Sequence, residues 1–315
     1  MTEKKRVIAL GFFDGIHIGH SALMRRTLEI GRDKSLTPSV MTFDMHPLSL
    51  VSGKAIPLIN SPEDRTGLIH RMFGISDIIL LHFDKATASM PWGKFVDHLI
   101  GEFGARHLVA GHDYTFGDKG LGNSGLLARK CAETGLGCDI VPEVKLDGVT
   151  CSSSYIRGLI SNGEMEKANN FLGHPHVLTD VVRYGYRIGR TLPTPTICLY
   201  FPEDVIIPAF GVYAVKVYLP ESRGTGTVLS EKAQYLSPCF APGVTYVGAR
   251  PTVGGSGKIT AETHILDYHE NLYGRQVRIE FLSRLRPEIK FDSKAELKAH
   301  VQKDCENAAR YFDVR

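Results

Sequence analysis

Short apolar runs alternate with stretches of helical apolar spacing through the first half of the chain. The apolar runs are short enough for buried strands: Val7–Leu10, Ser39–Phe43, Ile75–Phe83, His107–Ala110 and Cys138–Val141. The stretches with helical character are Ser21–Leu28, Pro62–Phe73, Trp92–Phe103, Ser124–Thr134, a segment that starts at Ser152, and Met165–Phe171. Strands separated by helices predict a parallel sheet covered on both faces. We therefore predict an α/β fold for this half.

The second half has a different pattern, with many strand-like segments and little helix between them. These segments are Val181–Tyr186, Thr196–Tyr200, Gly211–Tyr218, Val244–Gly248, Ile259–Leu266 and Gln276–Phe281. We interpret them as a small antiparallel β-barrel, closed by an amphipathic C-terminal helix at Lys294–Phe312. The change of pattern predicts two domains, residues 1–178 and 179–315. The polar segment between Tyr218 and Gly243 is expected to be a flexible loop or a lid.

Composition narrows the class of protein without naming a function. A chain of 315 residues with 43% hydrophobic and 23% charged residues is ordinary for a globular protein of two domains. A formal net charge of +3 without a basic stripe argues against nucleic acid as a partner. The 6 cysteines form no Cys-x-x-Cys pair, which fits a reducing cytosol. No apolar run suits a transmembrane helix or a signal peptide, so we predict a cytoplasmic protein that is not bound to membranes.

The turn Gly11–His20 carries the most unusual combination of residues. It follows a predicted strand and precedes a predicted helix, so free backbone N–H groups and the helix dipole favour an anion there. Gly15 and Gly19 let the backbone approach a ligand closely, while His17 and His20 can donate hydrogen bonds to phosphate oxygens. We interpret this turn as a binding site for a nucleoside triphosphate.

Three further polar segments follow predicted strands of the same sheet. They are Thr42–Pro47, which contains His46 and Pro47, Gly111–Gly117, which contains Asp113 and Phe116, and Cys151–Arg157. Ligands bind beyond the carboxyl ends of parallel strands, so we expect these segments to lie near the Gly11–His20 turn. Hydroxyl groups at a helix N-terminus come from Ser152, Ser153 and Ser154, and Arg157 offers a guanidinium for phosphate. The serines would also serve as ordinary helix caps, and Asp113 also suits an ordinary turn.

These motifs resemble those of a known enzyme family. His17-Ile18-Gly19-His20 is similar to the His-x-Gly-His signature of nucleotidyltransferases, and the preceding Gly11–Gly15 narrows the resemblance to the bacterial bifunctional riboflavin kinase/FMN adenylyltransferases, or FAD synthetases. Ser152–Arg157 resembles their Ser-Ser-Thr-x-Ile-Arg motif, with Ser154 in the Thr place. The resemblance implies a Rossmann-like nucleotidyltransferase domain in which His17, His20 and Arg157 act in catalysis.

The same resemblance implies which residues bind each substrate. The ATP-binding residues would be Gly11, Phe12, Asp14, Gly15, His17, Gly19, His20, Ser152, Ser153, Ser154 and Arg157. The flavin-binding residues would be His46, Pro47, Asp113 and Phe116.

The second half resembles the riboflavin kinase module of that family. The matching segments are Gly211–Ala214, Gly248–Thr252, Glu262–Asp267 and Leu272–Gly274. The resemblance implies a riboflavin kinase-like barrel in which Glu262 is the general base that takes a proton from the ribityl hydroxyl. It also implies that the Thr196 hydroxyl helps to hold Mg²⁺ and phosphate.

One kinase motif differs from the family pattern. Where the family has Gly-Phe-Pro-Thr-Ala-Asn, this chain has Pro193–Cys198 after Leu192, so Thr196 is kept while Ile197 and Cys198 replace Ala and Asn. A thiol is a soft ligand that suits Mg²⁺ poorly, and Ile197 is bulkier than Ala.

Four functions are compatible with these residues. The first is FAD synthesis from FMN and ATP with Mg²⁺, together with ATP-dependent phosphorylation of riboflavin in the second domain. The second is a monofunctional FMN adenylyltransferase with an impaired kinase domain. The third is a flavin-binding regulator without catalysis. The fourth is a nucleotidyltransferase that uses another acceptor, since the His-x-Gly-His turn does not specify the acceptor. The residues do not predict an oligomeric state.

Overall fold

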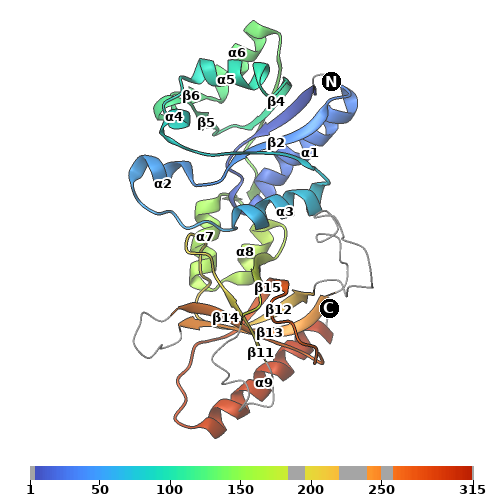
Figure 1. Ribbon diagram of the computed structural model, residues 1–315, viewed down its shortest axis with the longest axis vertical. Coiled ribbons are helices and arrows are strands. Elements are labelled where there is room, and N and C mark those ends of the chain that lie inside the picture. The colour runs from blue at the N-terminus through green and yellow to red at the C-terminus, as the bar shows by residue number, and fades with distance from the viewer. Residues whose placement is uncertain (1–3, 184–195, 220–239, 250–257, 314–315) are drawn as a thin grey trace. The chain divides into compact units, whose positions relative to one another are not determined.

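The computed structural model describes residues 4–183, 196–219, 240–249 and 258–313 (Figure 1). They fall into two compact units. The first unit comprises Met1–Leu58 and Arg65–Ser153, and the second comprises Ile59–Asp64 and Ser154–Arg315. Most of the segment predicted as a loop or lid, residues 220–239, lies outside the described residues.

The first unit is built around a parallel sheet of five strands in the order β3-β2-β1-β4-β7. In sequence order these are β1 (Arg6–Leu10), β2 (Thr37–Phe43), β3 (Asp77–Leu81), β4 (Ala105–Gly111) and β7 (Gly137–Val141). Every pair of neighbours runs parallel, so all five strands have their carboxyl ends at one edge. This confirms the α/β prediction, and the strand order brings β1 to the centre of the sheet.

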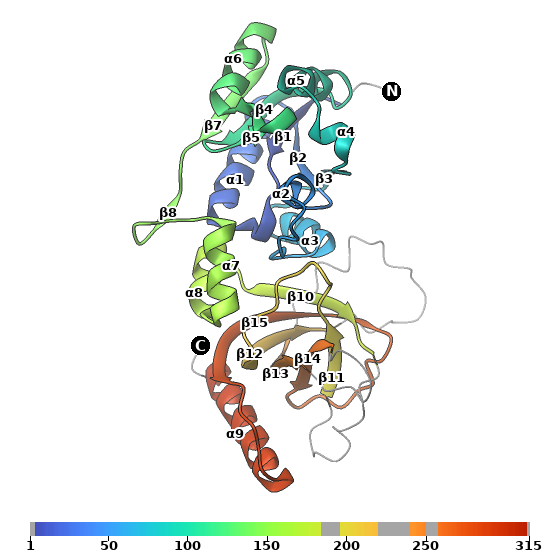
Figure 2. The ribbon, with the colours of Figure 1, turned by 90° about the vertical axis from the view of Figure 1, so that its left-hand side faces the viewer.

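Helices surround this sheet (Figure 2). They are α1 (Ile18–Asp33), α2 (Pro47–Ser52), α3 (Pro62–Phe73), α4 (Lys85–Ala88), α5 (Trp92–Gly101) and α6 (Ser124–Thr134). The described part of this unit also contains two short antiparallel hairpins. In one, β5 (Thr115–Phe116) pairs with β6 (Gly122–Asn123), and in the other, β8 (Lys145–Leu146) pairs with β9 (Val149–Thr150). Because side chains alternate along a strand, Ile8 and Leu10 of β1 face one side, where they pack in a cluster with Leu99 of α5 and Leu127 of α6.

Helix α1 is joined to the sheet by a polar group that includes the buried His107. Arg26 of α1 bonds Asp139 of β7 at 2.8 Å, and the buried His107 of β4 bonds the other oxygen of Asp139 at 2.6 Å. A methyl group on Gly137 would lie 2.1 Å from the His107 ring, so only glycine leaves room for that ring. These contacts join the middle of α1 to β4 and β7.

The second unit contains a six-stranded antiparallel sheet in the order β10-β15-β12-β13-β14-β11. The strands are β10 (His176–Val181), β11 (Thr196–Tyr200), β12 (Gly211–Tyr218), β13 (Phe240–Ala249), β14 (Ile259–Ile265) and β15 (Gln276–Pro287). The two edge strands approach each other: Arg183 N–H donates to Cys198 O at 3.2 Å, and Tyr200 N–H donates to the Asp180 carboxylate at 2.9 Å. The sheet therefore curls toward closure, which confirms the predicted barrel.

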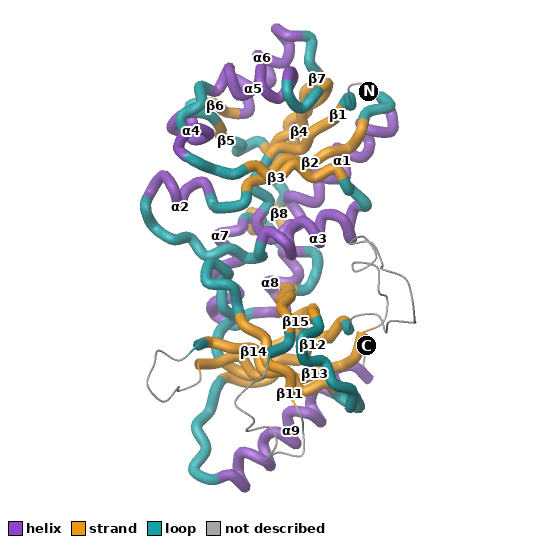
Figure 3. Tube along the Cα trace, in the orientation of Figure 1, coloured by secondary structure: helices purple, strands orange, loops and turns teal. Residues whose placement is uncertain are grey.

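Three helices accompany this barrel: α7 (Ser153–Asn162), α8 (Met165–Leu172) and α9 (Lys294–Asp313). Figure 3 shows α9, in purple, beside the orange strands. Ala308 of α9 packs in a cluster with Val212 and Val244, so the predicted closing helix is confirmed. The amide of Asn169 in α8 donates to the carbonyls of Phe281 at 2.8 Å and Leu282 at 3.2 Å, which ties α8 to β15.

Several predicted boundaries are wrong in this half. The strand expected at Val181–Tyr186 is β10, which starts at His176 and pairs with β15 along its whole length; residues 184–195 lie outside the described residues. Strand β13 starts at Phe240, inside the expected loop, and β15 continues beyond Phe281 to Pro287. Residue 178 lies within β10, while the division into functional domains at that residue stays a prediction.

His176 is a fully buried histidine in the second unit, with 0% of its surface exposed. Its backbone N–H donates to the Asn169 side chain at 2.9 Å, and its ring centroid lies 5.6 Å from that of Phe281. Neither ring nitrogen has a hydrogen-bond partner among the described residues. Burial, with a smaller contribution from His174, lowers the pKa of His176 to about 3, so the ring is neutral in the folded protein at pH 7.

We predict that His176 makes the second unit less stable in acid. His176 binds a proton near pH 6.5 in the unfolded chain but only near pH 3 in the folded chain. The free energy of unfolding therefore has its full value above about pH 6.5 and decreases as the pH falls from 6.5 toward 3. The slope is about 1.4 kcal/mol per pH unit for one proton. His176→Leu should flatten this slope, measured as amide exchange in β10 and β15 between pH 7 and 5. The exposed His269→Leu is the control, and equal slopes in wild type and His176→Leu contradict the prediction.

Candidate functional site

The turn after β1 has an unusual backbone. Phe13 has φ 58° and ψ 33°, and Ile16 has φ 45°, a left-handed conformation that side chains other than glycine seldom adopt. Gly15 has φ 83°, which glycine accepts without strain. A methyl group on Gly11 would lie 2.9 Å from the Phe13 ring, so this ring covers the end of β1. Such conformations persist only where surrounding contacts enforce them.

The carbonyl oxygen of Phe12 receives those enforcing contacts. The hydroxyl of Thr42, in β2, donates to it at 2.7 Å, and Nη1 of Arg65, in α3, donates to it at 2.8 Å. Nη2 of Arg65 donates to the carbonyl of Phe43 at 2.5 Å. The guanidinium carbon also lies 4.4 Å from the centre of the Phe12 ring. Arg65 therefore joins the carboxyl ends of β1 and β2, although it is fully buried.

Arg65 was absent from the sequence prediction. The segment Glu63-Asp64-Arg65 has the composition of a solvated helix start. One signal could have identified it: Arg65, Leu68 and Ile69 share the spacing of one helix face, and that face is buried. A cation on a buried face needs partners, and backbone carbonyls supply them here.

His17 and His20 lie at the N-terminus of α1, which starts earlier than predicted, at Ile18. His17 is the N-cap, and its Nδ1 accepts the backbone N–H of His20 at 3.3 Å. The two rings stack with centroids 3.5 Å apart and planes 18° apart. A methyl group on Gly19 would lie 3.0 Å from the His17 ring, which explains the glycine between the histidines.

His20 is held as a neutral ring. Burial lowers its pKa well below the ordinary value, and the nearby His17 ring and Arg65 guanidinium lower it further. Its Nδ1 is buried and has no hydrogen-bond partner among the described residues. Because Nδ1 of His17 accepts a hydrogen bond, the neutral His17 ring carries its proton on Nε2 and can donate from there.

The segment Cys151–Ser153 joins the same turn, as predicted. The Ser153 hydroxyl donates to the carbonyl of the buried Asp14 at 2.9 Å, and the Cys151 thiol accepts backbone N–H groups of Ile18 and Gly19. Ser152 is half-buried. The structure thus brings these three residues to the start of α1.

Ser154 and Arg157 belong to the second unit, on α7. Ser154 is exposed and Arg157 is half-buried, and Nη2 of Arg157 lies 3.4 Å from the Ser154 hydroxyl.

The residues expected to bind flavin have unlike surroundings. The His46 side chain caps α2, which starts at Pro47, by accepting the N–H of Leu48 at 3.1 Å, and its ring lies 4.7 Å from that of Phe12. Asp113 is exposed in the turn after β4. Phe116 is 7% exposed and packs in the core cluster of the first unit, and its contact with flavin stays a prediction.

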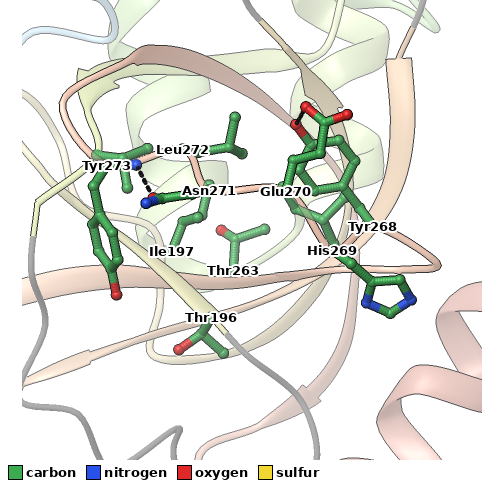
Figure 4. Close-up of a pocket in the computed structure, with 11 residues that line it drawn as sticks. Thr196, Ile197, Thr263, Tyr268, His269, Glu270, Asn271, Leu272 and Tyr273 are labelled. Carbon is green, nitrogen blue, oxygen red and sulfur yellow. Dashed lines mark hydrogen bonds between the residues drawn. The ribbon is translucent and has the colours of Figure 1, made fainter.

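The second unit has a cavity of about 210 Å³ at β11 and β14 (Figure 4). Thr196 and Ile197 from β11, Thr263 from β14 and the turn Tyr268–Tyr273 line it. In that turn the Tyr273 N–H donates to the Asn271 side chain at 3.0 Å. The predicted Thr196 is therefore at a cavity, and sequence reasoning missed most of the turn that surrounds it.

Glu262 and Cys198 do not line this cavity. In the register of β11 and β14, Thr196 faces His264 and Cys198 faces Glu262. Alternate residues share a face of a sheet, so Thr196, Cys198 and Glu262 lie on one face of this strand pair. Glu262 is half-buried and accepts the Thr260 hydroxyl at 3.4 Å, while Cys198 is 5% exposed.

The remaining parts of the predicted kinase motifs, Pro193–Pro195 and residues 250–252, lie outside the described residues. Within the described ranges, no group of three or more His, Cys, Asp and Glu side chains is arranged to hold a metal ion. The helices of those ranges include none with the length and hydropathy to span a membrane.

Known protein families match both halves of the chain. The family model for FAD synthetase matches residues 1–155, and the model for riboflavin kinase matches residues 172–312. A relative from Bacillus subtilis (strain 168), named bifunctional riboflavin kinase/FMN adenylyltransferase, is 32% identical over 314 residues, or 98% of this chain and 93% of the relative. A relative of the same name from Escherichia coli (strain K12) is 31% identical over 310 residues, covering 98% and 93%.

One solved structure is similar along almost the whole chain. It is described as a macrolide-efflux protein from Streptococcus pneumoniae, with a TM-score of 0.81 and 28% sequence identity. The similarity covers 98% of this chain and 95% of that one.

We predict that Arg65→Met destabilises the first unit by about 3 kcal/mol, because it removes two charge-assisted hydrogen bonds to the carbonyls of Phe12 and Phe43. The measurement is the free energy of unfolding in urea. Arg25→Met, at an exposed position of α1, is the matched control and should change stability by less than about 0.5 kcal/mol. Equal stability of the two variants contradicts the role given to Arg65.

Proposed function

The chain belongs to the family of bifunctional riboflavin kinase/FMN adenylyltransferases, and from this premise we propose that it makes FAD in two steps. The second unit phosphorylates riboflavin with ATP to give FMN. The first unit then transfers the adenylyl group of a second ATP to FMN, which gives FAD and pyrophosphate. ATP, FMN and riboflavin are thus its small-molecule substrates.

The observation that supports adenylyl transfer most strongly is the stacked pair of His17 and His20 at the start of α1. The helix N-terminus favours the negative charge of a triphosphate. His17 can donate from Nε2, and the neutral His20 can turn a ring N–H toward phosphate without adding a second buried charge. Gly15 and Gly19 have no Cβ, so no side chain at these two positions would keep the backbone away from a ligand.

In the proposed reaction a phosphate oxygen of FMN attacks the α-phosphorus of ATP in line. The new P–O bond forms as the bond from the α-phosphorus to the bridging oxygen breaks, and pyrophosphate leaves with that electron pair. No residue needs to bond covalently to the substrate, so catalysis consists of positioning and of stabilising the charge that develops on the phosphate oxygens. His17 and His20 supply donors in the first unit, and we assign Ser154 and Arg157 on α7 to the same reaction by their family motif.

For the kinase step, we propose Glu262 as the general base for the ribityl hydroxyl, since it is a half-buried carboxylate on the same face as Thr196. The hydroxyl of Thr196 is a hard oxygen donor that fits Mg²⁺ with phosphate, whereas the Cys198 thiol is soft and nearly buried and does not fit. Mg²⁺ would neutralise phosphate charge when it binds with ATP. The cytoplasmic location expected from the sequence stays a prediction.

The adenylylation proposal predicts that His20→Ala lowers the rate of FAD formation from FMN and ATP by about 10²–10³-fold, the cost of losing one preorganised donor to a transition-state oxyanion. FMN formation from riboflavin, measured in the same samples, should be unaffected. His98→Ala, which changes a histidine of α5, is the matched control. A His20→Ala enzyme with wild-type FAD formation would remove the proposal's main support.

The kinase proposal predicts that Glu262→Gln lowers the initial rate of FMN formation from riboflavin and ATP by about 10²-fold or more, because the amide cannot accept the proton. FAD formation from added FMN should persist. Glu203→Gln, at an exposed position of the second unit, serves as the control. If wild type forms no FMN but Cys198→Asn does, the chain is instead a monofunctional adenylyltransferase with an impaired kinase unit.

A further inference from the structure

The cavity of about 210 Å³ in the second unit has a buried apolar end and an exposed polar end (Figure 4). Three apolar side chains line the buried end: Val182 and Leu272 are each 2% exposed, and Ile265 is 4% exposed. The exposed end is formed by the turn Tyr268–Tyr273, whose side chains from His269 to Asn271 are open to solvent. A ligand that enters this cavity therefore buries an apolar part and keeps a polar part outside.

The charges of the cavity do not suit a phosphate group. None of the described residues that line it is a lysine or an arginine, and the exposed end carries the carboxylate of Glu270. A phosphate needs cationic or oriented N–H partners and is repelled by a carboxylate. An uncharged planar ring suits the cavity better, because the apolar side chains can cover its faces and the rings of Tyr268 and Tyr273 can stack on it.

Ile197 forms part of the cavity wall from β11. The strand register sets it directly opposite Thr263 of β14, which also lines the cavity, and Figure 4 shows the two side chains next to each other. Thr263 is 0% exposed, and its hydroxyl bonds that of Thr245 at 2.7 Å. Ile197 therefore has a fixed neighbour on β14.

The side chain of Ile197 is larger than the alanine in the kinase motif that this segment resembles. It is also stiff, because branching at Cβ restricts χ1, so the side chain stays where the strand places it. Ile197 is half-buried, unlike the side chains at the apolar end, so a ligand that enters from the exposed end can contact it. The space that an alanine would leave open is occupied in this chain.

We propose that Ile197 is a specificity-determining residue of the kinase reaction, because its side chain limits how far the planar heterocycle of a substrate enters this cavity. The inference rests on the proposed kinase function. Both substrates of that reaction carry such a ring, the purine of ATP and the isoalloxazine of riboflavin, and each ring is linked to a polar tail that would stay outside. The proposed base Glu262 lies on the other face of β14 from Thr263, so Ile197 acts on the ring and not on the proton transfer.

The full-length protein tests this with substrates whose rings are enlarged. One assay compares N6-ethyl-ATP with ATP at constant riboflavin. The other compares riboflavin with an analogue that has a dimethylamino group in place of the 8-methyl group, at constant ATP. Ile197→Ala should raise the ratio of kcat/KM for the enlarged ring over the natural ring by about 10-fold or more in one assay, since one methylene in an apolar pocket changes kcat/KM by about 10–200-fold. The ratio that rises identifies the ring that enters the cavity.

Ile259→Ala is the matched control, because Ile259 is a half-buried isoleucine of β14 that does not line the cavity. It should leave both ratios as they are in wild type. Ile197→Val should raise the same ratio as Ile197→Ala, to a smaller extent. The proposal is overturned if neither ratio rises in the Ile197 variants, or if both rise.

A binding measurement separates this inference from the kinase function itself. If wild type forms no FMN, the kinase function fails, and spectra of protein labelled with ¹³C at the isoleucine δ1 methyl groups decide the inference. Saturation with riboflavin or with a non-hydrolysable ATP analogue should shift the Ile197 signal through the ring current of the bound heterocycle, while the Ile259 signal stays in place. Ile197→Val removes the Ile197 signal and so identifies it. An Ile197 signal that neither ligand shifts overturns the inference.

Discussion

The hydrogen bonds at the Phe12 carbonyl are the constraint on which the first unit's site depends. Thr42 and Arg65 both donate to this oxygen, and Arg65 also reaches Phe43. Burying a guanidinium is costly unless it has partners, and two strand-end carbonyls and an aromatic face are partners of Arg65 here. The same contacts hold a turn whose backbone is strained at Phe13. The buried cation thus offsets the strain of the turn that it also shapes.

The charge of Arg65 also reaches the histidines. It adds to burial and to His17 in keeping His20 neutral. A neutral ring is easier to keep beside a helix N-terminus, whose own partial charge is positive. The positive potential of the site then comes from the dipole of α1 and from the Arg65 guanidinium. The imidazole rings of His17 and His20 contribute N–H groups that can donate hydrogen bonds in fixed directions. This division suits a triphosphate, whose charge needs compensation and whose oxygens need fixed positions.

The sequence predicted the regular parts of the fold well, because their signals are local. Pro62–Phe73 and Ser124–Thr134 match α3 and α6, and Gly211–Tyr218 matches β12. The misplaced strand β10 shows the limit of such signals. It starts with His176, a residue that looks polar and becomes buried only through tertiary contacts with β15. The extension of β15 is similar, since Arg286 lies in a strand because Asp304 of α9 pairs with it at 2.7 Å.

The candidate sites divide in the same way. The His-x-Gly-His turn and Ser153 could be recognised because their motif is contiguous, and the structure brings them together through Asp14. Arg65 could not be recognised, since its role comes from two carbonyls that are distant from it in sequence.

In the second unit the kinase motif keeps Thr196 but has Cys198 in the place of an asparagine, and the strand register sets Cys198 opposite Glu262. A residue directly opposite the proposed base on the same face affects that base through packing and polarity, even where it is no metal ligand. Because a thiol is a weaker hydrogen-bond partner than an amide, Cys198 offers Glu262 a weaker polar neighbour than an asparagine at that position would.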